Sequence, residues 1–271
     1  MRSLTQVEIP KESNLQIIEN KAFAQTSIKT FMIPIHVRTI GCGTFCDCGL
    51  QQIDFSANSE LQIIGTDAFR GSQIESLTIP SSITNLQEGW CSYLEKLIKI
   101  NIFQSNKNYT LYQDKFILGK SSQEKENFNV LLFSCRNVEK VIIPDFIEVI
   151  GPYAFELCTK LKYIEISPNS KLKEIKNDAF SNSKIKEIFI PSTVSKIGYR
   201  AFLKCTNLTK VKILPNSNLQ SIESYTFHNS NIKEIFIPPH VTEICDSAFL
   251  FCMNLENVEI SEDSQLRKIG N

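Results

Sequence analysis

The feature that most constrains this chain is a sequence that repeats every 47 residues. The stretch at 185–191 has the sequence IKEIFIP, it recurs unchanged at 232–238, and the related VEKVIIP stands at 138–144. Self-similarity at a fixed period is typical of a solenoid, in which each coil buries its apolar face only against its neighbours. We therefore expect a stack of coils in place of separate globular cores.

Each expected coil opens with a short strand of the form apolar-x-x-apolar-x-apolar. The last three of these positions alternate between inward and outward, which is the periodicity of a β-strand. About eleven coils follow from this pattern. The strand stretches are 4–9, 28–33, 50–55, 74–79, 97–102, 138–143, 161–166, 185–190, 208–213, 232–237 and 255–260.

Two coil types alternate along the chain. One type ends its strand in proline, as at Pro191 and Pro238, where the missing N–H marks the end of the strand. In both types an aromatic anchor follows, usually as Ala-Phe, and Trp90 appears at the same place in the least regular coil. The segment after each Phe has room for one helical turn at most. We predict a β-rich, α/β-type right-handed superhelix with a parallel sheet on one face and short turns or single helical turns on the other.

The full pattern is apolar-x-x-Ile-x-Ile-Pro, then Val-x-x-Ile-Gly, Ala-Phe, x-x-Cys and x-x-Leu. It resembles the leucine-rich repeats of the BspA-like surface antigens of bacteria and protists, over nearly the whole chain from Leu4 to Ile269. The resemblance implies a leucine-rich-repeat solenoid and adhesion or other protein–protein contact at a cell surface. It supplies no catalytic residues. A cell-surface or extracellular location is therefore expected, with a cytoplasmic location as the alternative because the sequence shows no signal peptide.

As to domains, we expect a single solenoid over 1–271, interrupted near 103–137. There the apolar runs 116–118 and 130–133 flank a polar stretch, which indicates a hairpin-like insertion with a mobile tip. Both ends of the chain lie in the middle of a repeat, which suggests a fragment of a longer protein.

Composition argues against several classes of partner. The formal net charge is +0 and no basic run of five or more residues occurs, which disfavours nucleic acid and anionic membrane. No apolar run approaches 18 residues, so we expect no membrane insertion by these residues.

Nine cysteines are present, and Cys48, Cys158, Cys205 and Cys252 recur at one place in their coils. Such a column indicates buried structural thiols rather than disulfides, because equivalent sites two coils apart are too distant to bridge. The group of Cys42, Cys46 and Cys48 offers a metal site as the weaker alternative, since no histidine or second cysteine pair lies nearby in sequence. We expect no metal and no cofactor.

Catalytic motifs are absent from the sequence. No phosphate-binding glycine loop or His-Glu-x-x-His occurs, and His36, His228 and His240 stand where turn or surface residues are expected. We therefore predict a non-enzymatic protein. Two glycosylation sequons begin at Asn108 and Asn207, of which Asn108, in the irregular region, is the better candidate.

The outward positions of the strands carry the candidate binding residues. If the strands stack in register, Glu187, Lys210 and Glu234 lie side by side, as do Phe189, Lys212 and Phe236. One interpretation is a ladder that satisfies itself, each pair contributing roughly 0.2–1 kcal/mol. The other is an exposed strip that binds a partner. The residues proposed for binding are Ile142, Tyr163, Glu187, Phe189, Lys210, Lys212, Glu234 and Phe236.

The functional hypothesis is a monomeric interaction or adhesion module whose sheet binds a protein or a surface glycan. The alternatives are a structural or antigenic spacer without a specific partner, and an intracellular scaffold.

Overall fold

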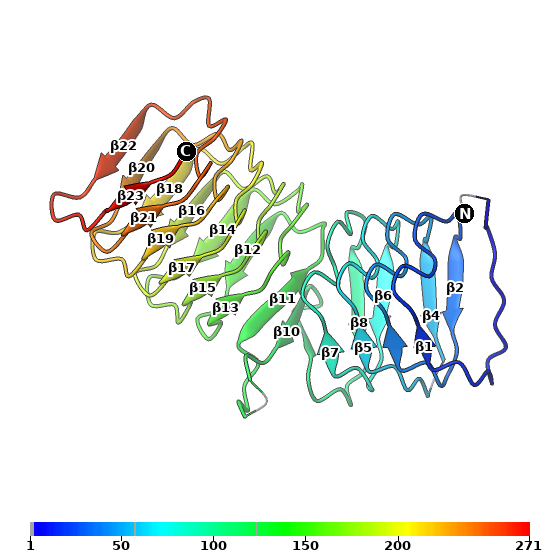
Figure 1. Cartoon of the computed structure of the whole chain (residues 1–271). Coiled ribbons are helices and arrows are strands. Elements are labelled where there is room, and N and C mark those ends of the chain that lie inside the picture. The colour runs from blue at the N-terminus through cyan, green and yellow to red at the C-terminus, as the bar shows by residue number, and fades with distance from the viewer. Residues whose placement is uncertain (1–2, 57, 123) are drawn as a thin grey trace. The chain divides into compact units, whose positions relative to one another are not determined.

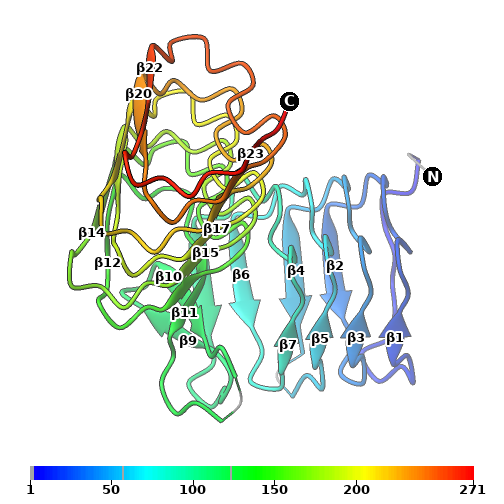
Figure 2. The same ribbon diagram turned by 60° about the vertical axis from the view of Figure 1, so that its left-hand side comes forward.

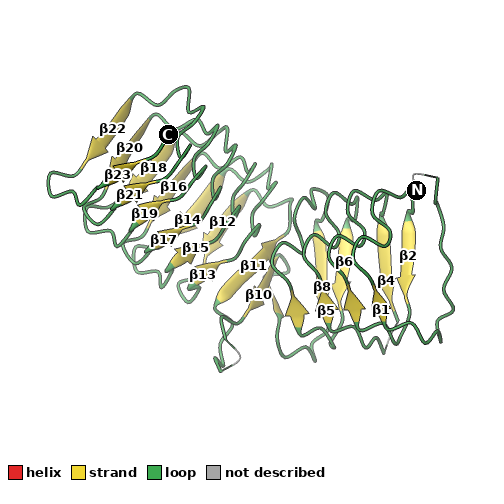
Figure 3. Cartoon of the chain, in the orientation of Figure 1, coloured by secondary structure: helices red, strands yellow, loops and turns green. Residues whose placement is uncertain are grey.

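The computed structural model describes residues 3–56, 58–122 and 124–271. These residues form strands and turns, and none of them belongs to a helix, so no helix among them is long and apolar enough to cross a membrane (Figure 3). The chain divides into two compact units, residues 1–119 and 120–271. Each is a parallel β-solenoid, which confirms the predicted fold class.

Two rows of parallel strands run along the first unit. The four-residue strands pair two by two, β2 with β4 and β6 with β8, whereas the two-residue strands form one continuous ladder in the order β1-β3-β5-β7 (Figure 1). The longer strands are β2 (Thr30–Ile33), β4 (Gln52–Phe55), β6 (Ser76–Ile79) and β8 (Lys99–Ile102). The shorter strands are β1 (Ile17–Ile18), β3 (Thr39–Ile40), β5 (Ile63–Ile64) and β7 (Asn85–Leu86).

The second unit repeats this plan, and Figure 2 shows its two rows of strands on separate sides of each coil. The longer strands are β12 (Lys140–Ile143), β14 (Tyr163–Ile166), β16 (Glu187–Ile190), β18 (Lys210–Ile213), β20 (Glu234–Ile237) and β22 (Asn257–Ile260). The shorter strands are β13 (Val149–Ile150), β15 (Glu174–Ile175), β17 (Lys196–Ile197), β19 (Ser221–Ile222), β21 (Glu243–Ile244) and β23 (Lys268–Ile269), and β11 (Val130–Ser134) precedes both rows.

The irregular region contributes an antiparallel pair, β9 (Thr110–Tyr112) with β10 (Phe116–Gly119). In the second unit, Asn129 accepts from the Ser121 N–H at 3.0 Å, and Lys125 lies 2.8 Å from the Glu148 carboxylate. These contacts attach part of the expected mobile tip to the second unit. The expectation that 103–137 is one hairpin-like insertion in a single domain stays a prediction.

The side of each coil that carries Ala-Phe is formed by short turns, one of the two forms predicted for it, and no helix occurs there among the described residues. Instead, the residue before Ala and the residue two after Phe adopt a left-handed backbone, as at Arg200 (φ 58) and Lys204 (φ 54). The N–H groups of Arg200 and Lys204, which are four residues apart, thereby point toward the following coil. The Phe202 N–H lies between them and donates to the Thr226 carbonyl at 2.8 Å, and the Lys204 N–H donates to the His228 carbonyl at 2.8 Å.

This turn ladder runs in one direction through the second unit. Phe155, Phe180, Phe202 and Phe227 each donate a backbone N–H to the next coil, at distances of 2.7 to 2.9 Å. A buried backbone polar group without a partner is costly. The N–H donors of each coil therefore depend on the carbonyl acceptors of the next coil. Where the pattern begins, the buried Arg136 guanidinium donates to the Ala154 carbonyl at 3.0 Å and the Tyr153 carbonyl at 3.3 Å. Arg136 therefore supplies donors where the preceding segment lacks an Ala-Phe turn.

Trp90 occupies a different place in its coil from the one predicted. Gly89 (φ 77) and Tyr93 (φ 53) are the left-handed residues there, as Asp67 and Gly71 are in the preceding coil. Trp90 therefore corresponds to the alanine and not to the aromatic anchor. Its side chain is nonetheless buried.

Phenylalanine rings stack along the interior behind the turn ladder. In the second unit the centroids of consecutive rings lie 5.0, 5.2, 5.4 and 5.7 Å apart, from Phe155 to Phe249, with planes within 7° of parallel. Phe155, Phe180 and Phe202 are fully buried. Isoleucines and leucines of both strand rows fill the rest of the interior.

Truncation of a stacked ring should destabilise the second unit strongly. We expect Phe202→Ala to lower the free energy of unfolding by about 3–5 kcal/mol, because the cavity lies between two coils that cannot collapse onto it. The matched control Tyr163→Ala removes an exposed ring and should change it by about 0.5 kcal/mol or less. Urea denaturation followed by circular dichroism measures both values, and equal effects would contradict the stacked interior.

A glycine at a left-handed turn position should stabilise the protein. Lys204 is exposed and left-handed, and Gly71 already occupies the equivalent place in the first unit. We expect Lys204→Gly to raise the free energy of unfolding by about 0.5–1 kcal/mol, because it removes the strain of a Cβ at positive φ. The control Lys210→Gly in β18 should lower it by a similar amount. A loss of stability in Lys204→Gly would contradict the assigned turn.

Candidate protein-interaction surface

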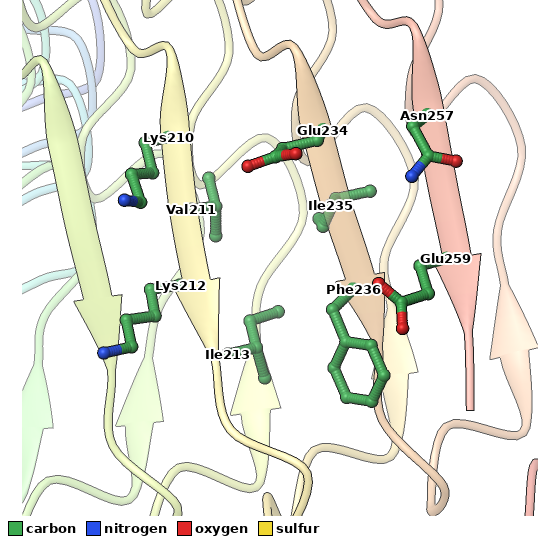
Figure 4. A pocket seen from close by; sticks show the side chains of 9 residues that line it. All are labelled: Lys210, Val211, Lys212, Ile213, Glu234, Ile235, Phe236, Asn257 and Glu259. Carbon is green, nitrogen blue, oxygen red and sulfur yellow. The ribbon is translucent and has the colours of Figure 1, made fainter. Parts of the chain in front are cut away.

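The outward side of the long strands in the second unit forms the candidate surface, which we call the sheet face. It consists of the first and third residues of the four-residue strands β12, β14, β16, β18, β20 and β22. The register is the predicted one where the strands pair: Glu187 lies opposite Lys210, Lys210 opposite Glu234, and Phe189 opposite Lys212. Figure 4 shows the side chains of β18, β20 and β22, with Lys212 and Phe236 in the same row. The fold thus brings the predicted binding residues onto one surface.

Large apolar side chains lie on this face without being buried. Ile142 is 57% exposed and Tyr163 is 49% exposed, while Phe189 and Phe236 are half-buried. Their neighbours in the same strands, such as Ile188 and Ile235, point inward and are buried. The outward residues of the first unit differ, since they are mostly Thr, Ser, Gln and Asn, as in β6 and β8. An apolar and charged strip is therefore a property of the second unit.

The charges on the sheet face are only partly paired. Lys140 lies 3.6 Å from Glu165, and the Lys212 ammonium lies 5.9 Å from the centre of the Phe189 ring. In the described part of the chain, no ion pair within 4.0 Å joins Lys210 to Glu187 or to Glu234. On the sheet face of the described chain, the charge pairing that the sequence allows therefore forms only between β12 and β14, at Lys140 and Glu165.

Shallow grooves cross the sheet face where the strands separate. Strands whose equivalent residues are 23 positions apart in the sequence pair along their full length. Glu187 to Ile190 pair in this way with Lys210 to Ile213. Strands 24 residues apart do not: β18 pairs with β20 only at Lys210 and Glu234, and β14 and β16 belong to separate sheets. A groove of about 600 Å³ lies over β14, β16 and β18, lined among others by Glu165, Phe189 and Lys212. A second groove, of about 190 Å³, reaches Phe236.

The three histidines lie apart from this surface. His36 Nδ1 lies 3.1 Å from the Glu60 carboxylate, and hydrogen bonds from His36 and Arg38 lower the pKa of Glu60. His240 Nδ1 lies 3.1 Å from the Ser217 carbonyl. His228 packs between the rings of Tyr225 and Phe251, and burial lowers its pKa.

The exposure of the two sequon asparagines does not follow the expectation that Asn108 is the better candidate for glycosylation. Asn207 is exposed, whereas Asn108 is half-buried and donates its side-chain amide to the Ile83 carbonyl at 3.4 Å. The irregular backbone that favoured Asn108 folds its side chain against the preceding coil. Asn207 is therefore the more accessible of the two.

All nine cysteines are free thiols. Cys205 and Cys252 lie at 3.1 and 3.0 Å from the carbonyls of Phe180 and Phe227, to which their thiols donate. Ser183 and Ser230 hold the equivalent places in alternate coils and contact these same two sulfurs. Burial raises the pKa of Cys205 to about 12, which keeps it protonated. The column is thus a structural one, as predicted.

Comparison with known proteins decides the family. The model of the BspA-type leucine-rich repeat region matches six copies over residues 1–117 and 126–256. The chain belongs to the BspA-type leucine-rich repeat family. Comparison with curated protein sequences gives no match. This family is one of repeat modules of the protein-interaction kind.

Solved structures share the fold of this chain at low sequence identity. A leucine-rich repeat protein of Eubacterium ventriosum is 21% identical, with a TM-score of 0.74, over 92% of this chain and 71% of that one. The pneumococcal vaccine antigen PcpA is 21% identical, with a TM-score of 0.67, over 96% of this chain and 60% of that one. A leucine-rich cell surface protein of Faecalibacterium prausnitzii is 20% identical, with a TM-score of 0.62, over 92% of this chain and 70% of that one. The chain thus spans about three fifths of the length of PcpA.

The buried thiols of the cysteine column should not react with thiol reagents in the native protein. We expect Ellman's reagent to modify the exposed Cys42 rapidly at pH 8, and Cys205 only after denaturation, because a buried protonated thiol is a poor nucleophile. Cys42→Ser should remove the fast phase, and Cys205→Ser should leave it unchanged. Rapid native labelling of Cys205, identified by mass spectrometry, would contradict its burial.

Proposed function

We propose that this chain is an adhesion-type interaction module that binds a partner protein or surface glycan on the sheet face of its second unit, at a cell surface. The single observation that carries the proposal is the combination of half-buried aromatic rings and unpaired charges on one rigid surface. Binding hot spots are enriched in aromatic residues that a partner can finish burying. Phe189 and Phe236 meet that description.

Rigidity favours binding at this place. The strands of the sheet face are held by the stacked interior, so a partner orders few additional side chains when it binds. The charged neighbours Lys210, Glu187 and Glu234 would give the partner orientation and would raise the association rate. The proposed mechanism is extended surface contact without any chemical step.

A cell-surface location is supported by the family and by two of the similar structures. These are a leucine-rich cell surface protein and a pneumococcal vaccine antigen. Those descriptions belong to those proteins, and the identity to this chain is 21% or less. The location is therefore part of the proposal, and antibody staining of intact against permeabilised cells tests it directly. Staining of permeabilised cells alone would remove the adhesion part and leave an intracellular scaffold.

Selection from a random peptide phage library, together with a glycan array, tests the proposed surface. The immobilised protein should enrich ligands whose affinity falls at least about 100-fold in Phe189→Ser/Phe236→Ser, because two hot-spot rings contribute roughly 2 kcal/mol or more each. The control Tyr199→Ser changes a ring that is 41% exposed and lies in the Ala-Phe turn, outside the sheet face, and it should retain binding.

Two results would overturn the placement or the function. Ligands that bind the double phenylalanine variant as well as the wild-type protein would place the binding surface elsewhere. If neither the library nor the array enriches a ligand, the spacer without a specific partner becomes the better description. Circular dichroism and thermal melting of each variant verify that it is folded.

A further inference from the structure

We propose that the groove over β14, β16 and β18 binds a hexuronate, a sugar unit that carries a carboxylate, within an acidic polysaccharide. This inference rests on the proposed function, because it names the class of partner for the same surface. It is carried by three properties of the groove, which are a ring beside an ammonium without an ion-pair partner, a split between two strands, and carboxylates on the other side of the ring.

The ring and the ammonium stand on two strands that pair along their full length. Phe189 of β16 lies opposite Lys212 of β18 in the register, and adjacent paired strands lie about 4.8 Å apart. Both side chains line the groove, and the Lys212 ammonium lies 5.9 Å from the centre of the ring. Among the described residues, no carboxylate lies within 4.0 Å of that ammonium. Lys212 therefore offers a cation beside an aromatic surface.

A sugar ring that carries a carboxylate matches this pair of side chains. A pyranose presents C–H groups on its faces, and the negative face of an aromatic ring attracts polarised C–H groups. A hexuronate can thus lie against Phe189 while its carboxylate, at the edge of the sugar ring, reaches Lys212. A hydrogen bond between an ammonium and a carboxylate is roughly twice as strong as a neutral one. Lys210 also lines the groove and extends from β18 away from β20, as Lys212 does (Figure 4).

The floor of the groove is a split between β14 and β16. These strands belong to separate sheets, although just before them the Lys186 N–H donates to the Lys162 carbonyl at 3.1 Å. Ile164, Ile166 and Ile188 line the groove with buried side chains, so they present mainly their backbone to it. A sugar hydroxyl both donates and accepts, so it can meet either kind of backbone group. A peptide strand needs about 4.8 Å on each side and cannot enter a split that a hydrogen bond closes at one end.

Carboxylates line the groove on the side of the ring that faces away from Lys212. Glu165 stands on β14, and Glu187 precedes Phe189 by two residues on β16. Lys140 lies 3.6 Å from Glu165, which offsets part of its charge. Carboxylates accept hydrogen bonds from hydroxyl groups, and a hexuronate carries hydroxyls on the ring carbons across from its own carboxylate. The groove, of about 600 Å³, thus places acceptors for hydroxyls and a cation for a carboxylate on opposite sides of one ring.

Isothermal titration calorimetry with trigalacturonic acid tests this inference. Its trimethyl ester has the same rings and hydroxyls but no charge, and a triglutamate peptide with blocked ends has three carboxylates but no sugar ring. Non-specific attraction would not separate the acid from the peptide, and stacking alone would not separate the acid from the ester. We expect the acid to bind the wild-type protein at least about tenfold more tightly than either control, because only the acid satisfies both Phe189 and Lys212.

Three variants assign the preference to the groove. Lys212→Gln should remove the preference for the acid over its ester, and Phe189→Ser should abolish saturable binding of the acid. The matched control Lys160→Gln removes an exposed lysine from the turn before β14, outside the groove, and should bind the acid as the wild-type protein does. Circular dichroism of each variant verifies that it is folded.

Several results would overturn the inference. These are equal affinity for the acid and its ester, equal affinity for the acid and the peptide, no saturable binding of the acid up to about 5 mM, or equal losses in Lys160→Gln and Lys212→Gln. If library-selected ligands still depend on Phe189 and Phe236 in that case, the proposed function stands and only the partner class is wrong.

Discussion

The hydrogen bonds that run from each Ala-Phe turn to the following coil are the constraint on which the rest of this structure depends. A single coil cannot satisfy the N–H groups that its own left-handed residues direct outward, so it forms only against a neighbour. The bond from Phe202 to Thr226 and its equivalents hold consecutive coils in register. The rings behind them then stack with nearly parallel planes. One repeated turn therefore determines both the coil spacing and the interior.

Because the turn ladder and the interior hold the fold, the sheet face is available for binding. The second and fourth residues of the long strands β12, β14, β16, β18 and β20 are buried apolar side chains, and the turn ladder lies on another side of the coil. Outward residues can therefore vary without affecting the fold. The two-coil period places Phe189 and Phe236 at the same slot, with Lys212 between them. Repetition of the fold thus places the same kind of side chain on the sheet face in alternate coils.

Much of this could be predicted from the sequence because the signal is repeated. Ten of the eleven predicted strands form, and only the stretch 4–9 does not. The register of Glu187 with Lys210 and the buried column with Cys205 also follow from the 47-residue period. The left-handed turns could not be predicted, since residues as different as Lys204 and Asn229 adopt them through backbone bonding and not through their side-chain type. The role of Arg136 was also missed, because only the fold reveals that its guanidinium donates to the carbonyls of Tyr153 and Ala154 where the preceding segment has no Ala-Phe turn.

The sheet-face residues were named correctly as outward, but their state of pairing depends on structure. Alternating Lys and Glu in a sequence suggest satisfied pairs. The coils that are 24 residues long separate their strands, and Lys210 then has no carboxylate within ion-pair distance in the described chain. The grooves over β14 to β22 have the same origin. A one-residue difference in coil length is visible in the sequence, but its effect on pairing is not.

The central claim is that the turn ladder holds the fold and leaves the sheet face free for a partner. Native-state amide hydrogen exchange in the wild-type protein and in Phe189→Ser/Phe236→Ser tests this claim most directly. The account predicts that the slow exchange of the Phe155, Phe180, Phe202 and Phe227 amides is unchanged in the variant, to within about threefold. A uniform loss of protection by two or more orders of magnitude would show that the two rings stabilise the fold, and would contradict the account.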